Sequence, residues 1–128
     1  MIEISGVDHL NIGVKDLEAS KRFYSRLFGF ELKEQGERDG RKWAIVGVPG
    51  RIYLAMYEEG DQERLEQDLQ INHFGFHVRN FGEIERNLKA AGVALDHRWD
   101  YGKSRSVYLN DPTGYEIELS EVLGGGLD

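Results

Sequence analysis

The sequence contains no cysteine, only two prolines, and no long apolar or basic run. Without thiols there can be no disulfide framework, cysteine nucleophile or thiolate metal site, so any metal ligands must be imidazoles or carboxylates. The net charge is -7 and no run of Lys and Arg exceeds two residues, which argues against a nucleic acid partner. No apolar run approaches the roughly 20 residues of a membrane span, and no signal-peptide pattern is present. We therefore expect a cytoplasmic protein with no membrane partner.

The 128 residues suffice for one domain with a substantial core, and the pattern within them repeats. His73 follows His9 by 64 residues, and Gly92 follows Gly29 by 63. We predict a single domain over residues 1–128. Its parts are module one at 1–58, a linker with a short surface helix at 59–70, module two at 71–122 and a frayed tail at 123–128.

Each module is predicted to contain a strand, a helix and three further strands. The strands alternate apolar and polar residues, and the helices carry an apolar stripe and end at a glycine. In module one the elements are strand 6–14, a helix between the N-cap Asp16 and Gly29, and strands 30–37, 42–48 and 52–57. In module two they are strand 71–78, a helix ending at Gly92, and strands 93–99, 104–110 and 115–120.

Two histidines and a carboxylate share the polar faces of these strands. His9 and His73 occupy equivalent places in the two modules, and Glu116 and Glu118 both alternate with apolar residues in the last strand. Two imidazoles and one carboxylate form a facial triad that holds a divalent first-row ion and leaves positions open for substrate. Iron, manganese, zinc and nickel are all admissible. The alternative is that each histidine is a surface or hydrogen-bonded strand residue, and the spacing alone leaves both interpretations open.

Three segments resemble the vicinal oxygen chelate superfamily, which includes glyoxalase I, extradiol dioxygenases, fosfomycin-resistance enzymes and bleomycin-resistance binding proteins. Residues 8–14 (DHLNIGV) resemble the start of its first module, and residues 72–78 (NHFGFHV) the start of its second. Residues 108–119 resemble the closing segment, where an Asp-Pro-x-Gly turn precedes the strand with the metal carboxylate. The resemblance implies an α+β fold with two βαβββ modules, whose curled mixed sheets surround a central cavity with the helices outside.

The resemblance also implies the metal ligands. It assigns His9, His73 and Glu118 to one divalent metal ion, and decides for Glu118 over Glu116. The repeat offset of 64 puts Leu54 where glyoxalase I has a fourth ligand. This departure favours a three-ligand site like those of the dioxygenases and fosfomycin enzymes.

Further site residues follow from strand alternation and from the resemblance. Asn11 and His77 lie two residues beyond the ligand histidines, so they should face the same cavity, His77 as a candidate general base; its alternative is a hydrogen-bonded strand histidine. Asn11 departs from the threonine that the fosfomycin glutathione transferases carry there. In the extradiol dioxygenases and the fosfomycin enzymes a tyrosine at the matching place contacts substrate. The resemblance therefore implies that Tyr108, which should share a face with Ser106, donates a hydrogen bond to a bound oxyanion; its alternative is a strand aromatic whose hydroxyl reaches solvent. The candidate substrate contacts are Ser106, Arg105, Leu54 and Trp43; Trp43 could instead be a core or dimer contact.

The leading functional hypothesis is a metal-dependent enzyme that chelates a small, oxygen-rich substrate and stabilises an oxyanion. Its reaction would be dioxygenase-like or fosfomycin-resistance-like. The rival is a metal-free protein of the bleomycin-resistance type that binds a drug or metabolite. A glyoxalase-type isomerase or lyase requires another residue to replace the missing fourth ligand. Because the superfamily usually dimerises, we expect a homodimer.

Overall fold

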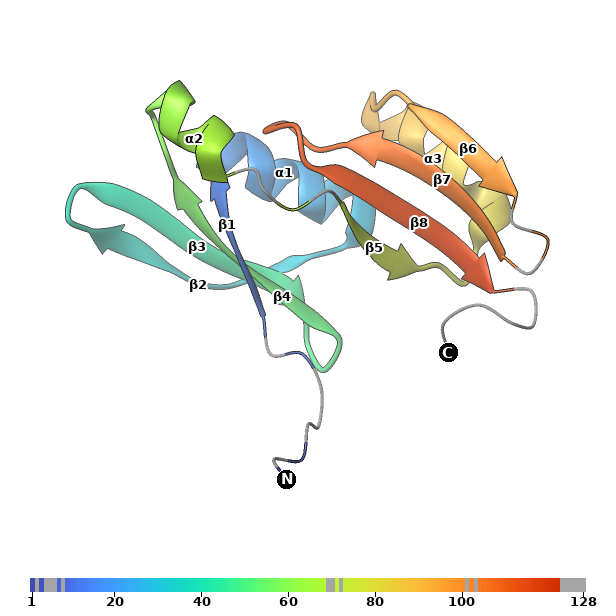
Figure 1. Cartoon of the computed structure of the whole chain (residues 1–128), viewed down its shortest axis with the longest axis horizontal. Helices are drawn as coiled ribbons and strands as arrows, with labels where there is room; N and C mark the ends of the chain where they lie inside the picture. Colours follow the sequence, from blue (N-terminus) through green and yellow to red (C-terminus); the bar gives the residue numbers. More distant parts are fainter. Residues whose placement is uncertain are drawn as a thin grey trace. The chain divides into compact units, whose positions relative to one another are not determined.

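The computed structural model describes residues 1, 3, 7, 9–68, 71, 73–100, 102 and 104–122. The chain divides into two compact units, Met1–Asp68 and Leu69–Asp128 (Figure 1). The predicted tail at 123–128 lies outside the described residues. In the part of the chain that the structure describes, no helix combines the length and apolar character needed to cross a bilayer.

The first unit is a four-stranded mixed sheet with two helices. Along the chain it contains β1 (Leu10–Val14), α1 (Leu17–Phe28), β2 (Glu31–Arg38), β3 (Arg41–Val48), β4 (Ile52–Glu58) and α2 (Gln62–Asp68). The strand order is β1-β4-β3-β2, with β1 parallel to β4 and the other pairs antiparallel. The short helix predicted in the linker is α2.

Helix α1 begins and ends at the residues that the sequence predicts. The Asp16 carboxylate accepts a hydrogen bond from the Ala19 backbone N–H, and Gly29 ends the helix with a φ of 68°, which favours glycine. Alternation in the strands turns one side chain in two toward the core. The fully buried residues Val14, Leu54 and Met56 share one sheet face, and α1 contacts β3 and β4.

The second unit repeats this topology. It contains β5 (Phe74–His77), the 3-10 turn η1 (Phe81–Glu83), α3 (Ile84–Ala91), β6 (His97–Asp100), β7 (Ser104–Asn110) and β8 (Glu116–Val122). The strand order is β5-β8-β7-β6, and Gly92 ends α3 with a φ of 69°. The α+β fold with two βαβββ modules is thereby confirmed. The predicted strand 93–99 is shorter than expected, because regular pairing with β7 begins at His97.

The turn between β7 and β8 is held by one buried carboxylate. Asp111 Oδ1 accepts hydrogen bonds from the backbone N–H groups of Thr113, Gly114 and Tyr115, at 2.9, 2.8 and 2.9 Å. Asp111 is 5% exposed, and Gly114 has a φ of 112°, which L side chains rarely adopt. This network explains the Asp-Pro-x-Gly motif physically, since it fixes where β8 starts and therefore the register of its carboxylates.

Candidate metal centre

Strand pairing in the second unit gathers polar side chains on one face of the sheet. Residues paired directly across strands project to the same side. The residue between Tyr108 and Ser106, Val107, is buried on the opposite side at 3% exposure. The register forms two rows on the polar face, one of His97, Tyr108, Glu118 and Gly75, and one of Trp99, Ser106, Ser120 and His77.

His73 and Glu118 lie in direct contact at this face. His73 Nε2 is 3.1 Å from Glu118 Oε2, and both side chains are partly exposed. The hydroxyl of Ser106 donates a hydrogen bond of 2.6 Å to the other carboxylate oxygen, Glu118 Oε1. A Cβ at Gly75 would lie 3.3 Å from the Glu118 carbonyl oxygen, a tight contact, so the glycine eases the close approach of β5 to β8 at Glu118. Glu118 is therefore positioned by neighbours on two adjacent strands.

The His73–Glu118 pair fits one divalent ion. Metal–ligand bonds to imidazole and carboxylate are about 2.1 Å long, so adjacent ligands of an octahedral ion lie about 3.0 Å apart. The observed separation of 3.1 Å is close to that value. One nitrogen and one oxygen donor suit zinc, iron(II), manganese and nickel alike. A carboxylate ligand is typically held in one orientation by a hydrogen bond to the oxygen that does not bind the metal, and the Ser106 hydroxyl makes such a bond to Glu118 Oε1.

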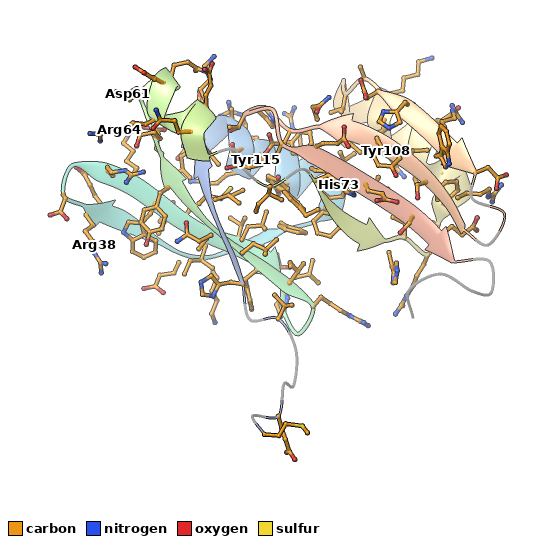
Figure 2. The ribbon with its side chains drawn as sticks, in the orientation of Figure 1. Arg38, Asp61, Arg64, His73, Tyr108 and Tyr115 are labelled. Atoms are coloured by element: carbon orange, nitrogen blue, oxygen red, sulfur yellow. The ribbon has the colours of Figure 1, made fainter. Side chains whose placement is uncertain are left out.

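Tyr108 lies between two histidines on this face (Figure 2 labels Tyr108 and His73). Its ring meets His73 edge-on, with centroids 6.0 Å apart and an interplanar angle of 80°. It stacks on His97 with a centroid distance of 4.1 Å and an angle of 7°. Tyr108 is 5% exposed, so its ring is held on both sides and its position is well defined.

Asp96 and His97 are not among the site residues predicted from the sequence. His97 Nδ1 is 2.5 Å from Asp96 Oδ2, and potential ligand atoms of Asp96, His97 and Glu116 lie within 4.8 Å of one another. Glu116 also approaches His73, with Oε1 at 4.0 Å from Nδ1. His97 lies two residues before Trp99 in the predicted strand 93–99, so strand alternation places both side chains on one face of the sheet. The sequence could therefore have assigned His97 to a face, although not to its neighbours.

Asn11 and Trp43 share one sheet face in the first unit. Asn11 pairs with Ala55, and Trp43 is in register with Tyr57, two residues further along β4. A Cβ at Gly36 would lie 2.9 Å from the Trp43 ring, so this glycine lets the indole lie across β2. His9, which immediately precedes β1, is exposed.

In the first unit, the position equivalent to Glu118 is Ala55 and not Leu54, which the offset of 64 predicts. Asn11 pairs with Ala55 as Gly75 pairs with Glu118, so Ala55 and Glu118 are structurally equivalent. Alanine has no ligand atom, so the expectation of a missing fourth ligand is unaffected. Leu54 itself is 0% exposed and belongs to the core face of the sheet.

Arg105 lies apart from the polar face of the second unit. It pairs with Glu121 in register and forms an ion pair with it, and its guanidinium lies 5.1 Å from the centre of the Phe81 ring in η1. His77, by contrast, is exposed and pairs with Ser120 on the polar face. The structure therefore groups His73, His77, Ser106, Tyr108 and Glu118, and separates Arg105 from them.

The sequence as a whole matches a known family. A sequence model of the Glyoxalase/Bleomycin resistance protein/Dioxygenase superfamily matches residues 6–119. The chain belongs to this superfamily. The resemblance seen in residues 8–14, 72–78 and 108–119 is thereby confirmed.

Relatives within the superfamily include enzymes of two kinds. Metallothiol transferase FosB of Bacillus licheniformis is 30% identical over 121 residues, which are 91% of this chain and 75% of that protein. Catechol-2,3-dioxygenase of Bacillus subtilis is 24% identical over 123 residues, which are 91% of this chain and 41% of the dioxygenase. The structure of the fosfomycin resistance protein FosX from Listeria monocytogenes matches with a TM-score of 0.74 at 25% identity, covering 98% of this chain and 97% of that one.

Proposed function

We propose that this protein is a divalent-metal-dependent enzyme that binds a small substrate through two adjacent oxygen atoms and opens an epoxide of the fosfomycin type. The observation that carries the proposal is the 3.1 Å contact between His73 Nε2 and Glu118 Oε2, with Ser106 bonded to the second carboxylate oxygen. His9 is the proposed third ligand. A bound ion would supply Lewis acidity to the oxygens that it chelates.

The relatives favour epoxide opening over ring cleavage. The match to FosB covers three quarters of that protein and the match to FosX nearly all of it, whereas the chain spans less than half of the catechol dioxygenase. FosB and FosX, which this chain covers for most of their length, are therefore better precedents for its reaction than the catechol dioxygenase. The Listeria FosX has been solved with Mn(II), which makes manganese the first ion to test.

The remaining side chains of the site have distinct proposed roles. Tyr108, held between two imidazoles, donates a hydrogen bond to the oxygen that gains charge when the epoxide opens. His77 and Asn11 are proposed as further polar contacts of the substrate, and Trp43 as an aromatic one. Ser106 acts through Glu118 by keeping that carboxylate in one orientation.

Metal analysis and a fosfomycin assay test this function. Protein dialysed against a chelator and reloaded with Mn²⁺ is expected to hold about one ion per chain by mass spectrometry. Phosphorus NMR is expected to show fosfomycin converted to a ring-opened product with L-cysteine, glutathione or water. His73→Ala should abolish both results, while Arg98→Ala, which removes an ion pair with Glu85, should leave both intact.

The outcomes separate the proposal from its rival. Protein that takes up no ion after reloading with Mn²⁺, Fe²⁺, Zn²⁺ or Ni²⁺, yet binds fosfomycin or bleomycin in calorimetry, supports the metal-free binding protein and refutes the enzyme. Protein that holds the ion and cleaves catechol, but leaves fosfomycin intact, supports the dioxygenase reaction instead.

We also propose that the active form is a homodimer. Each sheet is open, with β1 and β2 at the edges of the first and β5 and β6 at the edges of the second. Exposed edges favour further association. Light scattering at micromolar concentration is expected to give twice the 14.6 kDa mass of the chain; a monomeric mass would contradict the proposal.

A further inference from the structure

A carboxylate orients the ring of one histidine beside the proposed centre. His97 Nδ1 lies 2.5 Å from Asp96 Oδ2, a short charge-assisted hydrogen bond in which the ring nitrogen donates. An imidazole whose Nδ1–H is bonded in this way carries its lone pair on Nε2, on the far side of the ring from the carboxylate. This arrangement prepares Nε2 to accept a proton.

The same ring is fixed relative to the metal centre. His97 stacks on Tyr108 at 4.1 Å and 7°, and the Tyr108 ring also meets the His73 ring, at 6.0 Å. His97, Tyr108 and Glu118 are consecutive in one row across β6, β7 and β8, so all three project from one sheet face. The side chain of His97 is 46% exposed, which leaves it accessible to a small molecule in solution.

We propose that His97, positioned by Asp96, is the general base that activates a protic nucleophile, a thiol or water, for attack on the substrate. This inference rests on the proposed function and names the class of its second substrate. The nucleophile gives its proton to His97 Nε2, and its sulfur or oxygen forms a bond to an epoxide carbon. The carbon–oxygen bond breaks, the oxygen keeps the electron pair, and the imidazolium returns the proton to it. The product is a hydroxy thioether or a diol.

The alternative role for His97 is that of a metal ligand. Ligand atoms of Asp96, His97 and Glu116 lie within 4.8 Å of one another, close enough to share a cation. All three residues are at least partly exposed, and the Asp96 carboxylate already holds His97 Nδ1. The two roles differ in the metal content that they predict for a His97 variant, so the experiment measures it.

The tautomer of His97 tests the geometry without any substrate. Long-range proton–nitrogen NMR of the metal-free protein is expected to show neutral His97 protonated at Nδ1. Asp96→Asn should shift the ring toward the Nε2–H form, since the amide is a weaker acceptor than the carboxylate. A wild-type His97 protonated at Nε2 would overturn the proposal, because that nitrogen could not then accept a proton.

Kinetics with the Mn²⁺-loaded protein, fosfomycin and L-cysteine test the role. General-base catalysis contributes about 100-fold or more, so His97→Ala is expected to lower kcat by about 100-fold with an unchanged metal content. Added imidazole should restore part of the lost rate, which a merely structural role would not permit. Asp96→Asn should lower kcat by a smaller factor, and Arg98→Ala, on the opposite face of β6, should not.

The outcomes keep the two proposals apart. If the wild-type protein opens fosfomycin and His97→Ala is equally fast, the role of His97 is refuted and the proposed function stands. If His97→Ala loses metal in proportion to activity, His97 is a ligand and not the base. If the wild-type protein binds Mn²⁺ but opens no epoxide with any nucleophile, the proposed function fails, and the role of His97 in it fails with it.

Discussion

Ser106 and Glu118 are joined by a hydrogen bond of 2.6 Å that runs diagonally between β7 and β8. In register, Ser106 pairs with Ser120 and Glu118 pairs with Tyr108, so the serine reaches a carboxylate two residues away from its own partner in β8. Ser106 is 1% exposed, and its hydroxyl cannot readily exchange this partner for water. The bond involves Oε1, while the other oxygen, Oε2, lies 3.1 Å from His73 Nε2 and is the one that would face the proposed metal ion.

Ser106→Ala is expected to weaken metal binding without unfolding the protein. Loss of such an outer hydrogen bond typically costs about 10- to 100-fold in metal affinity, because the carboxylate is no longer held in one orientation. Competition titration of Mn²⁺ against a fluorescent chelator measures the change. Ser120→Ala is the matched control on the same face. Equal affinities for Ser106→Ala and Ser120→Ala would contradict the orienting role.

Glu118→Gln and Glu116→Gln should differ in their metal content. An amide replaces the anionic donor in each, but Glu118 Oε2 lies 3.1 Å from His73 Nε2, whereas Glu116 Oε1 lies 4.0 Å from His73 Nδ1. We expect Glu118→Gln to hold little Mn²⁺ after reloading and Glu116→Gln to hold about one ion per chain, measured by mass spectrometry. The opposite result would make Glu116 the ligand.

Local alternation was sufficient to predict the face of each site residue within a strand. In β8, Ile117 and Leu119 are buried and Glu118 is not, as the period of two predicts. The same alternation places Arg105 opposite Ser106, so Arg105 could have been removed from the substrate contacts by sequence alone. Its position above Phe81 confirms that placement.

Relationships between strands could not be predicted in the same way. Gly29 follows Val14 by 15 residues, but Gly92 follows Val78 by only 14. The offset between equivalent residues of the two modules is therefore 64 before the helix and 63 after it. This moves the counterpart of Glu118 from Leu54 to Ala55. The position of His97 beside Tyr108 depends on the register of β6, a short strand of four exposed residues whose pattern specifies no partner.

Asp111→Ala is expected to destabilise the second unit. The substitution removes the acceptor of three backbone hydrogen bonds in a turn where Asp111 is 5% exposed. Because buried donors left without a partner are costly, the expected loss is about 2 to 4 kcal/mol of unfolding free energy. Urea denaturation followed by circular dichroism measures it. Asp111→Asn, which retains the Oδ1 acceptor, should lose less; an equal loss would show that the charge and not the bonding pattern matters.

Gly47→Ala is expected to destabilise the first unit through a backbone collision. A Cβ at this position of β3 would lie 2.1 Å from the carbonyl oxygen of Ile52 and 2.6 Å from Tyr53 Cδ1 in the paired strand β4. Since paired backbones cannot move apart without breaking the hydrogen bonds of the sheet, we expect a loss of about 3 kcal/mol in unfolding free energy. Gly60→Ala is the matched control, because nothing lies within 4 Å of a Cβ there. If urea midpoints for the two variants coincide, Gly47 is not required for the close approach of β3 and β4.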